Sequence, residues 1–393
     1  MEKDKSCRMK RLLAVFFIIV LGSLFLLNVK GLVGIAKQEW CAIFSHGDKY
    51  EFLSPEEIEN TYNTNFFERM RFVELNGLTA KLLNQKIING AVKDSSGQLN
   101  LMSDTQYQFE KKKEKEKTER AIDILEYGRD SGAKILYVQR PWKNTDKQVM
   151  LPYGLSLQQG LQADFWCHQM EAAEIPVLDL RQSLGKNLAF YKTDHHWTTR
   201  TSFFAAEDII EELNACYHLG LNQNDQYFNL SNYHKQVYNN SFLGSEGIKA
   251  GKYYAGKDDY EVLWPQFKTQ FRYRQYVDHK KILDRTGDFY KAFIDETRLL
   301  DPDYNNKYDS YGFAASVENR VNNYNADNNN KVLLIADSFA RPMFTFFSLC
   351  FAETRYLDPQ EGRYNDSFIE YIKQYKPDVI VMMFPGDGSF VEV

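Results

Sequence analysis

Cysteine is scarce in this chain, and the few cysteines are scattered. The 393 residues contain five of them, namely Cys7, Cys41, Cys167, Cys216 and Cys350. None lies in a Cys-x-x-Cys pair or at zinc-ligand spacing, so the sequence favours neither a disulfide framework nor a structural zinc site. A single bridge among the last four cysteines stays an open alternative.

A net positive charge is also lacking, above all once the first residues are set aside. The whole chain has a net charge of −5, and without residues 1–11, which hold five basic and two acidic side chains, the remainder carries −8. A mildly acidic protein is a poor partner for nucleic acid or anionic lipid. The sequence also lacks a nucleotide-binding loop and a metal cluster. We therefore expect no nucleic-acid partner, no cofactor and no metal.

One long apolar run is present, and it directly follows the basic N-terminal segment. It is unbroken from Leu12 to Leu27, near the short end of the range that spans a bilayer. A cleaved signal peptide and an uncleaved anchor both begin this way. No Ala-x-Ala-like site follows, and the run is long for a signal peptide. We therefore predict an uncleaved signal anchor over residues 12–29, with residues 1–11 in the cytoplasm and the rest outside the cell membrane.

Beyond this segment the sequence predicts a juxtamembrane region over residues 30–90 and one large domain over residues 91–393. Within the domain, short apolar segments typical of buried strands alternate with stretches of helical spacing. The strand-like segments lie at 134–139, 176–180, 331–335, 354–358 and 378–383. The helical stretches lie at 110–130, 156–173, 201–214, 339–351 and 366–374.

This alternation predicts a three-layer α/β fold with a parallel sheet of flavodoxin-like type. Functional sites then lie at the carboxyl ends of the strands. Residues from about 220 to 330 are rich in Asn, Tyr and Lys and break the rhythm, so we interpret them as an insertion. Residues 141–143 (Pro-Trp-Lys) follow the first strand and could line a cleft, although a solvent-exposed Lys143 is the simpler interpretation.

The most informative stretch is residues 194–197, which read Asp-His-His-Trp. An Asp-x-His spacing lets one loop supply a general base and the carboxylate that orients it. Two adjacent imidazoles rarely bind one metal ion, and we expect His195 to point away from His196 because neighbouring side chains diverge in an extended segment. Trp197 is either a packing residue or a platform for substrate.

Ser338 follows the strand at 331–335 and precedes a helix. At such a turn the backbone N–H and the helix N-terminus both favour a developing oxyanion. The simpler alternative is that Asp337 or Ser338 merely caps the helix.

Together these stretches resemble the DHHW protein family and the wider AlgJ/AlgX-like group of SGNH-hydrolase-like polysaccharide O-acetyltransferases. The resemblance covers roughly residues 90–393. It rests on the stretches 194–197, 241–245 (Ser-Phe-Leu-Gly-Ser), 336–339 (Ala-Asp-Ser-Phe) and the pair Asp358-Pro359.

The resemblance implies Ser338 as nucleophile, His196 as general base and Asp194 as the carboxylate that orients it. Weaker candidates for oxyanion or substrate contacts are Gly244, Ser245 and Trp197, and a plain turn is the simpler role for Gly244. The implied function is O-acetylation of a bacterial exopolysaccharide or cell-wall glycan, with a multipass membrane O-acyltransferase supplying the acetyl group. Two alternatives are a carbohydrate acetyl esterase and a non-catalytic scaffold that binds polysaccharide in an export complex.

Overall fold

The computed structural model describes residues 2–46, 54–64, 66–143, 149–300, 306–360, 363–364 and 366–383. The chain divides into two compact units, residues 1–79 and 80–393, and each is described by itself. Residues 384–393, which end the large domain predicted from the sequence, lie outside the described residues.

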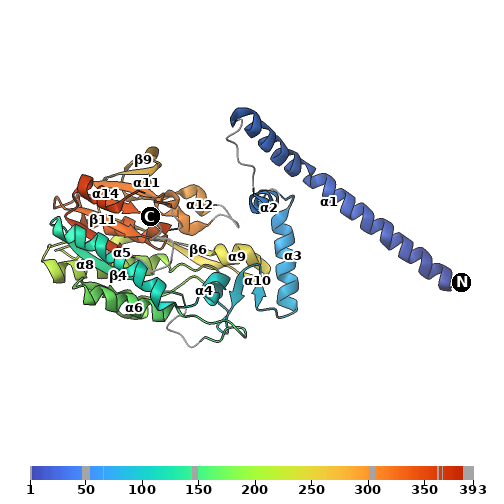
Figure 1. Ribbon diagram of the computed structural model, residues 1–393, viewed down its shortest axis with the longest axis horizontal. Helices are drawn as coiled ribbons and strands as arrows, with labels where there is room; N and C mark the ends of the chain where they lie inside the picture. The colour runs from blue at the N-terminus through green and yellow to red at the C-terminus, as the bar shows by residue number, and fades with distance from the viewer. Residues whose placement is uncertain are drawn as a thin grey trace. The chain divides into compact units, whose positions relative to one another are not determined.

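The N-terminal unit is dominated by one long helix, α1 (Glu2–His46) (Figure 1). Its segment Arg8–Val29 contains an 18-residue window with a mean hydropathy of 2.8, and only 6% of this window is buried. At about 1.5 Å per residue such a segment is long enough for a hydrocarbon layer of roughly 30 Å. The predicted N-terminal apolar helix is thus confirmed by length and composition. It is followed by α2 (Pro55–Thr64) and α3 (Arg69–Leu82).

The second unit is built on a sheet of eight strands in the order β5-β4-β13-β11-β12-β10-β8-β9. The first five strands run parallel, while β10, β8 and β9 add an antiparallel edge. The parallel strands are β5 (Val177–Asp179), β4 (Lys134–Gln139), β13 (Val379–Met383), β11 (Lys331–Ala336) and β12 (Glu353–Leu357). The antiparallel strands are β10 (Glu318–Asn323), β8 (Phe271–Val277) and β9 (Lys280–Gly287).

Helices cover both faces of this sheet, and strand β11 shows how its residues divide between the two layers. Val332 and Leu334 pack with the apolar residues of α8 and α13, whereas Leu333 and Ile335 pack with those of α5, α6 and α14. Successive side chains of a strand point to opposite faces, so a strand covered on both sides must be apolar throughout. The helices are α5 (Lys111–Asp130), α6 (Gln159–Ala172), α14 (Phe368–Tyr375), α8 (Thr199–Tyr217) and α13 (Ala340–Phe347). The predicted three-layer α/β fold is confirmed.

Smaller elements surround this core. A three-stranded sheet precedes it, and the region from 220 to 330 holds a two-stranded ribbon besides the three antiparallel strands of the main sheet. The small sheet and ribbon comprise β1 (Ile87–Ile88), β2 (Ala91–Lys93), β3 (Leu99–Leu101), β6 (Tyr233–Phe242) and β7 (Asp258–Pro265). The short helices are α4 (Met102–Gln106), α7 (Leu180–Ser183), α9 (Ser245–Ala250), α10 (Lys252–Ala255), α11 (Phe289–Phe293) and α12 (Glu296–Leu300).

The close packing of α5 on the sheet depends on Gly128. A Cβ atom there would lie 2.4 Å from Cδ1 of Ile380, which is fully buried. We expect Gly128→Val to lower the free energy of unfolding by about 2 kcal/mol or more, because a tightly packed core resists added volume. Gly160→Val on α6 is the control, since no atom lies within 4 Å of its Cβ position. Equal losses in urea unfolding of the two variants would contradict this prediction.

Candidate active site

The predicted site residues lie on two turns next to the sheet. Ser338 lies two residues after β11 and two before α13. Residues 194–196 lie in a loop that is closed by a bridge between Phe190 and Trp197. The loop leads into α8, where Thr198 caps the helix by accepting the Thr201 N–H. The serine turn therefore lies between a strand and a helix, and the histidine loop is held by the bridge and by the start of α8.

Asp194 lies within hydrogen-bonding distance of His196, and His196 lies within hydrogen-bonding distance of Ser338. Oδ1 of Asp194 lies 2.5 Å from Nδ1 of His196, and Nε2 of His196 lies 2.9 Å from Oγ of Ser338. Because Nδ1 faces a carboxylate, it carries the ring proton and leaves Nε2 free to accept the serine hydroxyl hydrogen. The two turns thus form a Ser–His–Asp arrangement of the kind used in nucleophilic catalysis.

Asp194 is fully buried, and its carboxylate accepts three hydrogen bonds, one of them from Nδ1 of His196. Its Oδ1 also accepts the His196 N–H at 2.9 Å, and its Oδ2 accepts the Ser245 N–H at 2.7 Å. Burial alone raises a carboxyl pKa, but the imidazoles of His196 and His195 and the Ser245 amide hold the pKa of Asp194 well below its usual range. The charged form of the Asp194 carboxyl group is therefore favoured in the folded protein.

Gly244 and Ser245 lie against the carboxylate of Asp194. The Gly244 N–H donates to Oγ1 of Thr193 at 2.9 Å, and the Ser245 N–H is taken by Asp194. Neither amide is left for an oxyanion, which corrects the role considered for them from the sequence. A Cβ at Gly244 would lie 2.2 Å from Cβ of Asp194 and 2.7 Å from the Thr193 carbonyl oxygen. Glycine is required here by close approach to Asp194.

Lys143 is buried, not solvent-exposed as the sequence suggested. Its Nζ donates to the carbonyl oxygens of Leu99 at 2.6 Å, Asp194 at 2.8 Å and Lys192 at 3.2 Å. Burial lowers the pKa of Lys143 to about 8. Three converging carbonyl groups explain the position of this lysine, because they supply acceptors for all three ammonium hydrogens. Lys143 thereby ties the end of β4 to the Asp194 loop.

The imidazole of His196 is enclosed by aromatic rings. Tyr308 stacks on it with ring centroids 4.1 Å apart and an interplanar angle of 17°, and Phe339 lies at 4.8 Å. Burial and the neighbouring His195 lower the pKa of His196, so the ring is neutral near pH 7. Tyr308 lies in a region of the sequence without a recognisable pattern, and sequence reasoning missed it.

Trp197 is a packing residue. It is fully buried, and its Nε1 donates to the Phe339 carbonyl oxygen at 3.0 Å. The hydroxyl of Tyr308 donates to the same oxygen at 2.9 Å. A side chain with no exposed surface cannot serve as a platform for substrate, so this alternative for Trp197 is wrong. Its hydrogen bond instead joins the histidine loop to the serine turn.

The serine turn is fixed by the residue that precedes the serine. Asp337 accepts the Phe339 N–H on Oδ1 and the Arg140 guanidinium on Oδ2, with Nε and Nη2 both at 2.7 Å. Tyr356 donates to the Asp337 carbonyl oxygen. Arg140 is buried and lies 3.7 Å from the centre of the Phe339 ring. Sequence reasoning missed Arg140, although its place at the end of a buried strand was a usable signal.

The Ser338 backbone N–H takes no part in these hydrogen bonds. Within the described parts of the chain it has no hydrogen-bond acceptor. An unpaired backbone N–H next to a serine hydroxyl is the kind of donor that stabilises an oxyanion.

His195 lies against His196 and does not point away from it, contrary to the sequence-based expectation. The ring centroids are 4.0 Å apart, and Nδ1 of His195 lies 3.1 Å from Oε1 of Glu246. The loop is bent here, so neighbouring side chains do not diverge as they would in an extended segment.

Ligand atoms of Asp194, His195 and His196 lie within 4.8 Å of one another, so their spacing alone would also suit a metal ion. A cation there would have to replace the 2.5 Å hydrogen bond between Asp194 and His196.

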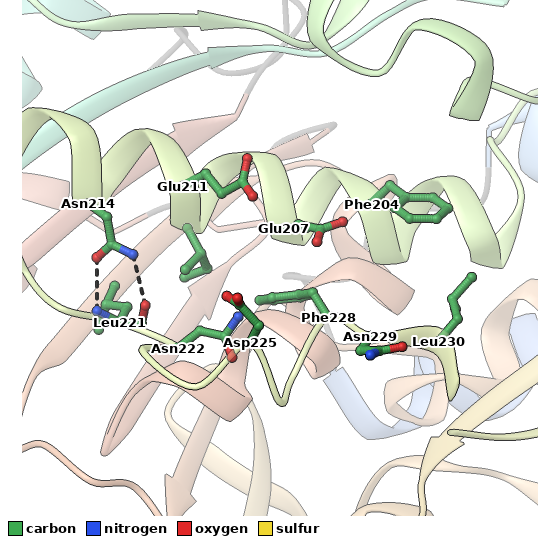
Figure 2. A pocket seen from close by; sticks show the side chains of 11 residues that line it. Phe204, Glu207, Glu211, Asn214, Leu221, Asn222, Asp225, Phe228, Asn229 and Leu230 are labelled. Atoms are coloured by element: carbon green, nitrogen blue, oxygen red, sulfur yellow. Dashed lines mark hydrogen bonds between the residues drawn. The ribbon is translucent and has the colours of Figure 1, made fainter. Parts of the chain in front are cut away.

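A separate cavity of about 480 Å³ opens between α8 and the loop from Leu221 to Leu230 (Figure 2). None of its lining residues belongs to the Ser–His–Asp arrangement. Its walls carry the carboxyl groups of Glu207, Glu211 and Asp225. Burial, with the charges of Glu211, Asp208 and Asp225 around it, raises the pKa of Glu207 to about 7.

With the fold and the site geometry described, the second unit is a three-layer α/β domain that carries a Ser–His–Asp arrangement. Residues 101–255 match the family model described as "SGNH hydrolase-like domain, acetyltransferase AlgX". This range includes Asp194, His196 and Gly244 and ends before Ser338. The resemblance noted in the sequence is thus confirmed for this part of the chain. A comparison with curated proteins gave no match.

Two solved structures share the fold. PatB1 of Bacillus cereus, solved with a sulfonyl adduct, superimposes with a TM-score of 0.59 at 14% identity, covering 77% of this chain and 99% of PatB1. A DHHW family protein of Eubacterium siraeum superimposes with a TM-score of 0.53 at 15% identity, covering 78% of this chain and 95% of that protein. At this identity the similarity concerns the fold.

We expect Gly244→Ala to break the Asp194–His196 hydrogen bond and to lower the free energy of unfolding by about 2 kcal/mol or more, because the new methyl group meets backbone and carboxylate atoms. A proton in a bond of 2.5 Å gives a far-downfield proton NMR signal, and this signal should be absent in the variant. Ser245→Ala is the control, since it keeps the N–H that Asp194 accepts. A downfield signal that persists in Gly244→Ala would contradict the assignment.

We expect Glu207→Gln to stabilise the protein above neutral pH. Because the folded-state pKa of Glu207 is raised, the charged form destabilises the fold, and stability falls as the pH rises through about 7. After allowance for solvent screening, the gain at pH 8 should be about 1 kcal/mol. At pH 4, where the side chain is already neutral, thermal unfolding should not distinguish the variant from the parent. The control is Glu116→Gln at an exposed position of α5, and an equal gain at both pH values would refute the prediction.

Proposed function

We propose that this chain is a membrane-anchored O-acetyltransferase that modifies a glycan outside the cell membrane. The observation that carries the proposal is the series Asp194–His196–Ser338, with distances of 2.5 and 2.9 Å. The match of residues 101–255 to the AlgX acetyltransferase model supports the same chemistry.

In the first half of the proposed reaction, Ser338 receives the acetyl group. Nε2 of His196 accepts the hydroxyl proton as Oγ attacks the carbonyl carbon of the acetyl donor. The negative oxygen of the tetrahedral intermediate is stabilised by the Ser338 N–H and by the N-terminus of α13. The donor's leaving group then departs with the proton from His196, which leaves an ester on Ser338.

In the second half a sugar hydroxyl replaces the serine. It loses its proton to His196 as its oxygen attacks the ester carbonyl, and Ser338 then leaves and takes the proton back. Asp194 stabilises the imidazolium in both halves and does not itself change protonation. Water in place of the sugar would make the same site an acetyl esterase, and product analysis with a glycan acceptor separates these outcomes.

The N-terminal segment supports a location at the membrane. We propose that residues 12–29 are an uncleaved anchor, with residues 1–11 inside and the catalytic domain outside. A donor in the membrane, such as a multipass O-acyltransferase, would then bring the acetyl group to the same side as the glycan. A polysaccharide-binding scaffold without catalysis is the second candidate. Binding alone does not require a buried, charged Asp194 next to His196.

The test is covalent labelling of the purified full-length chain in detergent. A sulfonyl fluoride and an activated acetyl ester should each add one group to Ser338, detected by mass spectrometry of the peptide. Ser338→Ala should abolish labelling, and His196→Ala should slow it by about 10² to 10⁴, the range of general base catalysis.

Ser202→Ala is the control, because this buried serine of α8 has an Oγ without a hydrogen-bond partner among the described residues. It should label at the rate of the parent chain. A folded parent chain that is never labelled at Ser338 by either reagent would refute the serine mechanism and favour the scaffold.

A further inference from the structure

The ion pair between His195 and Glu246 lies beside the proposed catalytic residues and has no part in the mechanism above. Glu246 belongs to α9 and is fully buried. Its Oε1 meets Nδ1 of His195 at 3.1 Å, and its Oε2 has no hydrogen-bond partner among the described residues. A buried carboxylate with so few partners is costly unless a positive charge lies against it.

His195 is the group that supplies this charge. Burial opposes its protonation, but the carboxylates of Glu246 and Asp194, and more weakly Asp104, outweigh burial and raise the pKa of His195 to about 9. Asp104 belongs to α4, and burial raises its own pKa to about 6. Its carboxyl group therefore becomes neutral as the pH falls below this value. Glu246 is then the hydrogen-bonded carboxylate that keeps His195 charged.

The charge on His195 acts on its neighbour in the stack. The centroids of the two imidazoles are 4.0 Å apart, and a cation at this distance disfavours a second positive charge on His196. Arg341 acts in the same direction from α13, while Asp194 opposes both. Arg140 and Lys143, at the end of β4, contribute positive charge near Asp104.

We propose that His195 and Glu246 form an ion pair against the ring of His196, which keeps His196 neutral and available as a base in acidic surroundings. His195 is thus a positioning residue that acts through His196. This inference rests on the proposed function, since it assigns a role in the same reaction. It predicts an enzyme whose activity extends to lower pH than that of a site with a single histidine.

The experiment is the pH profile of Ser338 labelling by the sulfonyl fluoride in the full-length chain. In His195→Gln the acid limb should move to higher pH by about one unit or more, so the rate at a pH that lies on the acid limb of both proteins should be lower by about tenfold, with little change at pH 8. Glu246→Gln should move the limb in the same direction, and the double variant should add little. His195→Lys, which keeps a positive charge, should restore the profile of the parent chain.

A matched control exists on α6, where His168 lies 3.5 Å from Glu171 on the exposed surface. His168→Gln should leave the profile unchanged. Acid limbs in both His195→Gln and Glu246→Gln that coincide with that of the parent would overturn the inference while labelling at pH 8 still supports the proposed function.

Titration of His196 by NMR in chains with labelled histidine tests the same idea without catalysis. The His196 pKa should rise when His195 becomes Gln. If Ser338 is never labelled, the proposed function fails, and an unchanged His196 pKa in this titration would overturn the inference by itself.

Discussion

The buried charge of Asp194 is the constraint on which the rest of the site depends. An ionised carboxylate without solvent is costly unless hydrogen-bond donors and an opposite charge surround it. Here the donors are backbone amides of two separate segments and the ring N–H of His196. The absence of a side chain at Gly244 lets one of these segments approach closely enough. The same contacts that make the charge tolerable therefore fix the direction in which the imidazole points.

Most of the fold could be predicted from the sequence because its strands are buried on both faces. After Lys331, the segment 332–335 is apolar at every position, and β11 occupies residues 331–336. The parallel arrangement followed from the alternation of strands with helices. The pairing of β8, β9 and β10 as an antiparallel edge of the main sheet could not be foreseen, because it is decided by distant chain segments.

The candidate site could be predicted only where the chemistry is local. Asp194 and His196 are two residues apart, and Ser338 follows a recognisable strand, so each was found. Lys143 and Tyr308 were not, because their roles are set by carbonyl groups and rings from elements far away in the sequence. For Lys143 the charge of the side chain suggested solvent, whereas three carbonyl groups make burial favourable.

The two turns that carry the site also hold each other in place. The Phe339 carbonyl oxygen accepts hydrogen bonds from Trp197 of the histidine loop and from Tyr308. Asp337, on the other side of Ser338, is held by Arg140 from a different strand. The serine is therefore flanked on both sides by residues whose positions require the finished sheet and the packing of α8 against α13. Because each of these bonds is buried, moving one turn would leave polar groups unpaired in the other, and the 2.9 Å contact between His196 and Ser338 is a consequence of the whole fold rather than of either loop.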